Sequence, residues 1–304
     1  FSVGFTLDDI DLSGMGMVGH TFDVGQIEIF HGAQSTIFGS NAVGGLISMR
    51  TNDPTQNFEV NSTSSIGSDG LYSFGGIINI PYKYFGLRFS SLKSYTNGFR
   101  DNIVRNLKNT NKKDELINRL KLNFKPNDKL SFLATLLYSN QDNGYDIWAP
   151  DNNQEFKTYS DRDGFDAQTT RGFSLKSSYR SFSTIDITSI TSISDVDLEH
   201  SYDGDWADSS YWHNNHGFDP AFEYYEYDFY DKNERTRKTI TQELRLKSPK
   251  FISGFYYKKL NEKDSAEGYL YGGIADNANG EYDIENYAST YNFRNIFFKN
   301  KVKN

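Results

Sequence analysis

The sequence predicts an all-β protein built from long antiparallel strands, and three observations lead to that prediction. The 304 residues include 21 Tyr and 24 Phe, and aromatic residues favour strands over helices. Apolar and polar residues alternate along many segments, which is the period of a strand with two unlike faces. Short turns also alternate with long connections. Residues 1–54 have a different, glycine-rich pattern, so we expect a division of the chain there.

The strand pattern is clearest in a hairpin between residues 116 and 138. Leu116, Leu120 and Leu122 alternate with polar residues, the segment 126–128 supplies a turn, and an apolar row then resumes at Leu130. Residues 103–122 also fit helical spacing, but we favour strand. Other strand-like segments are predicted at 58–66, 72–80, 85–91, 167–180, 183–199, 236–247, 251–263 and 287–297. We expect about eight or nine strands in all.

The lengths of the strands and connections predict a transmembrane barrel. Strands of about 10 or more residues exceed the usual globular length of about 5 to 6 and match the length that spans a bilayer. Long connections are expected at 97–113, 142–165, 200–234 and 264–280, with short turns at the opposite end. This asymmetry is typical of outer-membrane barrels, whose periplasmic turns are short. Large outer-membrane barrels whose lumen is filled have about 22 strands, so eight or nine strands would make an incomplete barrel.

The most specific motif lies in residues 27–54, IEIFHGAQSTIFGSNAVGGLISMRTNDP. Two apolar segments flank a glycine-rich stretch that suits tight turns. The order of residues resembles the end of the plug domain of TonB-dependent outer-membrane receptors. The residues that carry the resemblance include Glu28, Gly32, Gln34, Thr36, Phe38, Gly39, Asn41, Gly44, Gly45 and, as a retained charge, Arg50. The segment around Asp8 and Asp9 is similar to an earlier plug strand that runs into a tight turn.

The resemblance implies an α+β plug, of which residues 1–54 are the C-terminal part, followed by the N-terminal part of the barrel at 55–304. It implies active import of a scarce, bulky solute, by default a ferric siderophore, across the outer membrane of a Gram-negative bacterium. The TonB–ExbB–ExbD complex would supply the energy through a segment outside this chain. The implied protein is a transporter that needs no cofactor and is not an enzyme.

The motif departs from the family at four positions, His31, Ala33, Ser35 and Ser40. At His31 and Ser40 the family frequently has arginine. Because charged contacts help to hold the family's plug in its barrel, the loss of these arginines raises the question of what holds this plug. Glu28 and Arg50 are retained charges that could serve instead, and we state this as a hypothesis.

The long connections hold the candidate ligand-binding residues, because aromatic faces stack on rings of sugars and chelators. These are Tyr145, Trp148, Trp206, Tyr211, Trp212, Tyr224, Tyr225 and Tyr227. The same residues could instead pack on one another or lie in the aromatic girdle at the membrane interface, and we favour this second interpretation.

Other classes of site find little support. His213 and His216 could supply two metal ligands, and the acids between Asp203 and Asp208 could attract calcium, but we expect solvated loop residues and no metal. No catalytic arrangement is evident. The formal charge of −8 argues against nucleic acid as a partner, and the absence of Cys excludes disulfides and thiolate metal sites.

Two alternative functions stay open. A β-rich carbohydrate-binding surface protein would use the loop aromatics as a sugar platform and would be stable in water without detergent. A truncated receptor remnant would not transport, because an open barrel leaves unpaired strand edges in lipid.

Overall fold

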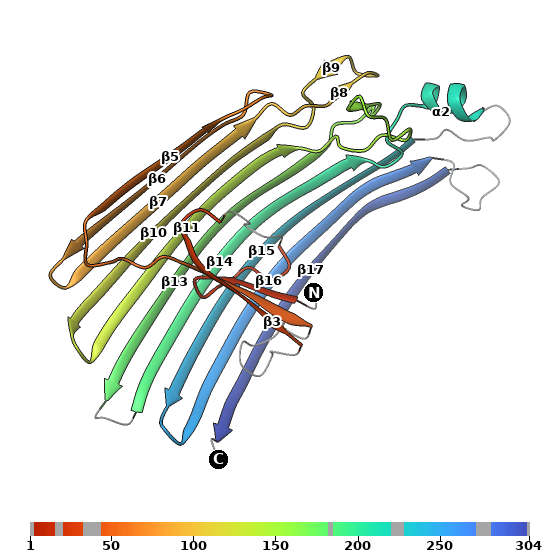
Figure 1. Cartoon of the computed structure of the whole chain (residues 1–304). Coiled ribbons are helices and arrows are strands. Elements are labelled where there is room, and N and C mark those ends of the chain that lie inside the picture. Colours follow the sequence, from red (N-terminus) through yellow and green to blue (C-terminus); the bar gives the residue numbers. More distant parts are fainter. Residues whose placement is uncertain are drawn as a thin grey trace.

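The computed structural model describes residues 3–15, 21–32, 44–181, 185–219, 228–271 and 281–302, which form two main sheets (Figure 1). The first is a four-stranded sheet with the spatial order β2-β1-β4-β3. It consists of β1 (Val3–Leu7), β2 (Ile10–Asp11), β3 (Val24–His31) and β4 (Gly45–Thr51). Strands β1 and β4 are parallel, and the other neighbours are antiparallel.

The second sheet is antiparallel throughout and has ten strands among the described residues. In spatial order it contains β5 (Glu59–Ile66), β6 (Tyr72–Tyr82), β7 (Phe85–Thr96), β10 (Lys113–Asn127), β11 (Leu130–Gly144), β13 (Phe165–Ser181), β14 (Ile185–Asp203), β15 (Asp228–Lys247), β16 (Phe251–Tyr271) and β17 (Glu281–Val302). The all-β fold is confirmed, and the barrel wall is incomplete. Where the structure describes them, the predicted strand segments lie on strands, and the sheet has ten strands where we expected about eight or nine.

The strands extend further toward the long connections than their apolar rows predict. Strand β14 reaches Asp203, which pairs with Tyr230 of β15, and β16 continues to Tyr271. The predicted connection 200–234 is therefore only 204–227. Backbone pairing continues here through polar residues, because the ladder needs only N–H and C=O groups and not an apolar face. Residues 103–122, for which helix was the alternative, contain no helix, and β10 begins at Lys113.

Short elements lie at the long-connection end of the large sheet (Figure 1). Strands β8 (Asp101–Asn102), β9 (Leu107–Lys108) and β12 (Lys157–Thr158) form a three-stranded sheet. Helix α2 (Ser209–His216) begins after Asp208, whose side chain accepts a hydrogen bond from the N–H of Tyr211. In the described part of the chain, no helix has the length and apolar character needed to cross a membrane.

The large sheet has an inverted distribution of polarity. Its concave face buries polar side chains such as Ser139, Thr170 and Ser192, while large apolar side chains such as Phe74 and Leu136 are exposed on the other face. A water-soluble sheet would bury its apolar side chains instead. An apolar outer band around a polar interior is typical of transmembrane barrels.

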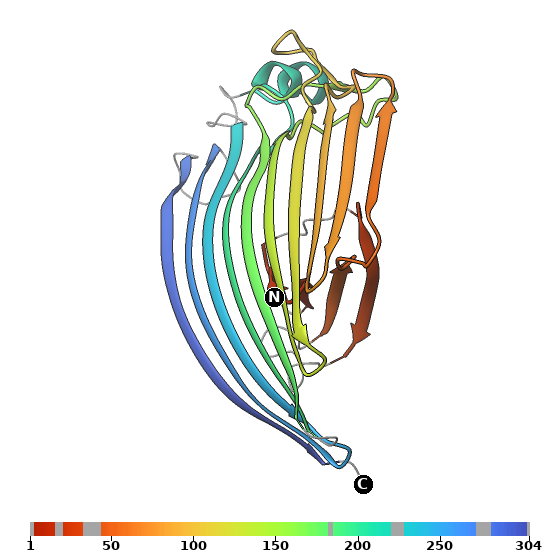
Figure 2. The ribbon, with the colours of Figure 1, turned by 90° about the vertical axis from the view of Figure 1, so that its left-hand side faces the viewer.

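The small sheet lies within the curve of the large sheet (Figure 2). Leu7, Ile10 and Met15 are almost completely buried, and they join a cluster with Ile117 of β10 and Val196 of β14. The concave face has an apolar patch where the small sheet lies against it. This contact fixes which hairpin of the small sheet faces the wall.

Gly172 of β13 makes room for this apolar contact. A Cβ atom at Gly172 would lie 3.0 Å from Cδ1 of Ile10 and 3.3 Å from Cβ of Leu137. We predict that Gly172→Leu displaces the small sheet and costs about 1–3 kcal/mol through overpacking. In the full-length protein this change should increase the entry of vancomycin into cells. Gly76→Leu is the control, since a Cβ there meets nothing within 4 Å. Equal vancomycin sensitivity of the two variants would contradict the prediction.

Candidate functional site: a charged junction and an aromatic cap

The tip of the β1–β2 hairpin points its carboxylates at the barrel wall. Asp8 and Asp9 form the two-residue turn, since Leu7 pairs with Ile10. Both aspartates have positive φ, 49° and 66°, which Asp tolerates better than most residues. The tight turn predicted at this position is therefore present. It carries two acidic side chains to the inner face of the large sheet.

Asp8 is the buried acceptor at the centre of the contact. Its carboxylate accepts hydrogen bonds from the N–H of Thr51 at 3.0 Å, from the Thr51 hydroxyl at 2.6 Å, and from Nζ of Lys121 at 2.7 Å. The side chains of Asp8 and Lys121 are each 5% exposed. Burial of an ionised carboxylate requires such a set of partners, because each lost hydration bond must be replaced.

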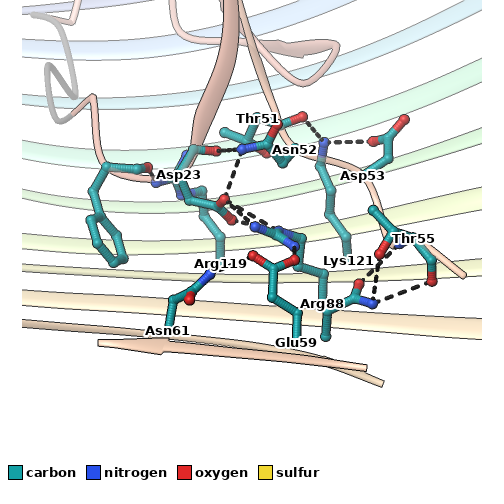
Figure 3. Close-up of polar contacts among 12 residues, drawn as sticks. Asp23, Thr51, Asn52, Asp53, Thr55, Glu59, Asn61, Arg88, Arg119 and Lys121 are labelled. Atoms are coloured by element: carbon teal, nitrogen blue, oxygen red, sulfur yellow. Dashed lines mark hydrogen bonds and ion pairs between the residues drawn. The ribbon is translucent and has the colours of Figure 1, made fainter. Parts of the chain in front are cut away.

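Lys121 connects the wall to three parts of the small-sheet segment. Besides Asp8, its ammonium group donates to the carbonyl of Thr51 and to the carboxylate of Asp53, each at 2.9 Å (Figure 3). These three contacts match the three donors of an ammonium group. Lys121 thus holds both the hairpin tip and the start of the connection to β5.

A second cation of the wall holds the entry into β3. The guanidinium of Arg88 in β7 donates to both carboxylate oxygens of Asp23, with its closest contact at 2.6 Å, and to Glu59 of β5 at 3.0 Å (Figure 3). Asp23 also accepts from the side-chain amide of Asn52 at 2.9 Å. Bidentate pairing of guanidinium with carboxylate fixes orientation as well as distance. The two ends of the β3–β4 hairpin are therefore tied to the wall together.

Further wall residues extend the same pattern across β13 to β16. Lys258 forms an ion pair with Asp11, and Arg237 donates to the carbonyl of Ser13. The hydroxyl of Ser174 donates to the carbonyl of Asp8 at 2.7 Å. The wall therefore supplies donors and cations, and the small sheet supplies acceptors. We call the contacts of Asp8, Asp23, Arg88 and Lys121 the charged junction.

The charged junction holds the small sheet through charges other than the two expected from the sequence. Sequence reasoning placed the compensating charges at Glu28 and Arg50, but in the described structure neither forms an ion pair with the large sheet. Glu28 accepts from Gln26 within β3, and Arg50 is exposed beside the junction. The signal that was missed is Lys121, a charge on the face of β10 opposite the apolar row of Leu120 and Leu122.

The other residues of the glycine-rich motif are only partly described. Gly32 has φ +76° and open space around it, whereas a Cβ at Gly45 would lie 2.7 Å from the carbonyl oxygen of Phe30. Gly45 therefore allows the close pairing of β3 and β4. Gly44 precedes β4 and is exposed. Five residues of the motif lie outside the described residues: Gln34, Thr36, Phe38, Gly39 and Asn41.

The second candidate site is an aromatic cap at the long-connection end of the wall. We use this name for the connections 145–164 and 204–219. Trp148 and Trp206 stack with ring centroids 5.9 Å apart, and they are 52% and 37% exposed. The indole N–H of Trp148 donates to the hydroxyl of Tyr145 at 3.3 Å. Three predicted ligand-binding residues are thus together at one place with exposed ring surface.

The remaining aromatic residues of the cap pack on each other around helix α2. The rings of Tyr159 and Tyr211 are 4.7 Å apart, and Trp212 contacts Tyr211 edge to face at 5.6 Å. Tyr159 also forms an isolated bridge with Ala207. The structure therefore holds both arrangements considered from the sequence, an exposed pair and a packed group. Tyr224, Tyr225 and Tyr227 lie outside the described residues.

Buried aspartates tie the cap connections together. Asp146 accepts hydrogen bonds from side chains of Asn102, Thr158 and Ser160 at 2.8–3.1 Å. Asp203 accepts from the N–H of Asp161 at 3.0 Å, which joins the two cap connections. The cap is thus cross-linked by carboxylates that accept from neighbouring segments.

The residues considered for metal binding have other roles in the structure. Nδ1 of His213 lies 2.8 Å from the carbonyl of Phe218, and His216 packs against Trp212. Asp208 caps helix α2. Within the described residues, no three His, Cys, Asp or Glu side chains converge as a metal site.

Asp205 is the most perturbed acid of the cap. It is 4% exposed, and burial together with the neighbouring carboxyl of Asp203 raises its pKa to about 10. The Asp205 carboxyl group therefore carries a proton at neutral pH.

We predict that the cap loses stability as pH rises. Because the pKa of Asp205 in the folded state is above its unfolded value of about 4, its contribution is complete below about pH 4 and is lost progressively toward about pH 10. Asp205→Asn should remove this part of the pH dependence. The measurement is the rate of proteolysis of residues 145–219 at pH 5, 7 and 9 in the full-length protein. Asp163→Asn, at an exposed residue, is the control, and an unchanged pH slope in Asp205→Asn would refute the prediction.

We predict that Lys121→Ala loosens the small sheet. Removal of Lys121 leaves Asp8 buried without its cation, at a cost of about 3–5 kcal/mol. The result should be increased entry of vancomycin into cells that carry the full-length variant. Lys112→Ala is the matched control, because Lys112 pairs with Asp142 at 3.0 Å on an exposed surface, where a pair contributes at most about 1 kcal/mol. Addition of Asp8→Asn to Lys121→Ala should restore part of the barrier. Equal entry in the Lys121 and Lys112 variants would show that the junction does not hold the sheet.

Comparison with known proteins places this geometry in a known fold. No model of a protein family matches the sequence. The structure is similar to the siderophore receptor PiuA from Acinetobacter baumannii (TM-score 0.64, 14% identity, 95% of this chain and 45% of that chain). It is also similar to the open form of the ferric-catecholate import receptor Fiu from E. coli K12 (TM-score 0.65, 16% identity, 93% of this chain and 45% of that chain).

A third similar structure is the ferripyoverdine receptor of the outer membrane of Pseudomonas aeruginosa (TM-score 0.64, 14% identity, 97% of this chain and 42% of that chain). The chain spans less than half the length of these three receptors. Nearly all of the chain aligns with them, across both the small sheet and the wall. The protein therefore has the fold of part of a TonB-dependent siderophore receptor, as the motif at residues 27–54 implies.

Proposed function

We propose that this chain is part of an outer-membrane receptor that imports a scarce, bulky solute, by default a ferric siderophore. Residues 1–54 would be the C-terminal part of its plug, and residues 55–304 the first part of its barrel. The TonB–ExbB–ExbD complex would drive the import through a segment outside this chain. The proposed protein is a transporter and not an enzyme.

One observation carries this proposal, namely the small sheet held against the concave face by the charged junction. A sheet that lies within the curve of the wall would occlude the lumen of the closed barrel. Occlusion by a part attached through polar contacts allows later movement, because water can replace such contacts as they break. The inverted polarity of the large sheet supports a location in a bilayer.

The aromatic cap is the proposed contact surface for the solute. Trp148 and Trp206 present exposed ring faces at the long-connection end, which is the extracellular end in outer-membrane barrels. Aromatic faces bind planar or ring-shaped solutes with little loss of side-chain entropy. The carbohydrate-binding alternative would use the same surface, but the exposed apolar side chains of the wall, such as Phe74 and Leu136, do not suit a protein stable in water.

The test is a deletion of the full-length gene, with growth measured on defined ferric siderophores, cobalamin or oligosaccharides as limiting nutrients. We expect loss of growth on one ferric siderophore, and the same loss when TonB is removed. Complementation with Trp148→Ala/Trp206→Ala should raise the siderophore concentration needed for half-maximal growth by about tenfold, since each lost stacking contact is worth about 0.5–1.5 kcal/mol. Complementation with Phe74→Ala, an exposed aromatic residue of the outer face that belongs to neither the aromatic cap nor a cavity lining, is the control.

Growth that depends on the gene but not on TonB would exclude the proposed energy source. Growth on all the siderophores without the gene would exclude the default cargo. Dependence on an oligosaccharide instead would identify the cargo as a glycan.

A further inference from the structure

A large cavity lies at the short-turn end of the wall, beyond the charged junction. It has a volume of about 890 Å³, and its lining includes turn residues 82–86 and 127–131. Other lining residues come from β13, β14 and β15, where they approach the same end. In outer-membrane barrels the short turns are on the periplasmic side.

The lining of this cavity is strongly basic. Seven of its residues are Lys or Arg and two are Asp, although the whole chain has a formal charge of −8. The basic residues that line the cavity from the wall strands and turns are Lys83, Lys125, Lys129, Lys176, Arg180, Arg245 and Lys247. We call this space the basic chamber.

Several of these cations have charge left for a ligand. Arg180 pairs with Asp186 at 3.4 Å, and Arg245 pairs with Glu243 at 2.7 Å. Lys125 and Lys247 form no ion pair in the described part of the chain. Lys176 is 3.8 Å from Asp9, its only ion-pair partner among the described residues, at the limit of such a contact.

The basic chamber continues toward the charged junction. A second cavity, of about 320 Å³, shares residues Asn123, Lys125, Ser131, Lys176 and Ser178 with it. This second cavity is also lined by Asp8, Asp53 and Lys121. The two cavities are therefore neighbours along the wall, between the charged junction and the short-turn end.

We propose that the basic chamber binds the anionic oxygens of the solute as it leaves the barrel, so that the cargo is a multiply charged anion that carries carboxylate, phosphate or catecholate groups. This inference rests on the proposed import function. Lysines are hydrated point charges on flexible stems, and a low-dielectric wall concentrates their field. Several such weak contacts attract an anion without trapping it, which passage requires.

The test is lysine footprinting of the purified full-length receptor, with citrate as the probe. Acetylation of each lysine is followed by mass spectrometry at constant ionic strength, and sucrose replaces citrate in the blank. Citrate should slow the acetylation of Lys125, Lys176 and Lys247. It should leave Lys250 unaffected, because this exposed lysine is at the same end but does not line the chamber. Equal effects on Lys250 and Lys125 would overturn the proposal.

A neutral variant supplies the second measurement. Lys125→Gln/Lys176→Gln should raise about tenfold the citrate concentration that halves the acetylation of Lys247, because two nearby charges no longer attract the anion. Lys250→Gln should leave that concentration unchanged. An unchanged value in the double variant would also overturn the proposal. Footprinting needs no transport, so its result is independent of the growth test of the proposed function.

Discussion

The buried ion pair between Lys121 and Asp8 is the interaction on which the arrangement of the two sheets depends. Two charges that are each 5% exposed are costly to bury unless both are fully hydrogen-bonded. Thr51 and Asp53 provide the remaining contacts. Because such a pair tolerates little displacement, it defines one position of the small sheet against the wall. The apolar cluster around Ile10 contributes buried apolar surface, and the ion pair sets the position of the small sheet along the wall.

This arrangement also reconciles stability with movement. A plug held only by apolar packing would leave an apolar surface in the lumen whenever it moved, and this exposure would be costly. Around the small apolar cluster, the contacts between the two sheets are made by carboxylates and cations such as Asp23 and Arg88. Water can solvate these charged groups when the sheets separate. The wall beyond them already has polar side chains and, at its short-turn end, the basic chamber. In the proposed import, the solute would meet polar side chains at the charged junction and in the basic chamber.

The sequence predicts the wall well and the site only in part. Alternation identifies the strands, because the period of two follows directly from side-chain direction, and the motif at 27–54 indicates the fold. In the described structure Glu28 and Arg50 form no ion pair with the wall, since contact depends on which hairpin faces it. The β1–β2 hairpin faces the wall because Ile10 packs against Gly172, a contact between residues that are distant in the sequence. The pairing of Trp148 with Trp206 likewise depends on two connections that are distant in sequence.

The most direct measurement of the central claim is a double-mutant cycle between positions 8 and 121 of the full-length protein. Hydrogen exchange of the Thr51 amide, which donates to Asp8, reports the opening of the junction in the wild type, Asp8→Asn, Lys121→Met and the double variant. The two positions should be coupled by more than about 1 kcal/mol, since they share one buried contact. Effects of the two substitutions that simply add would contradict the account.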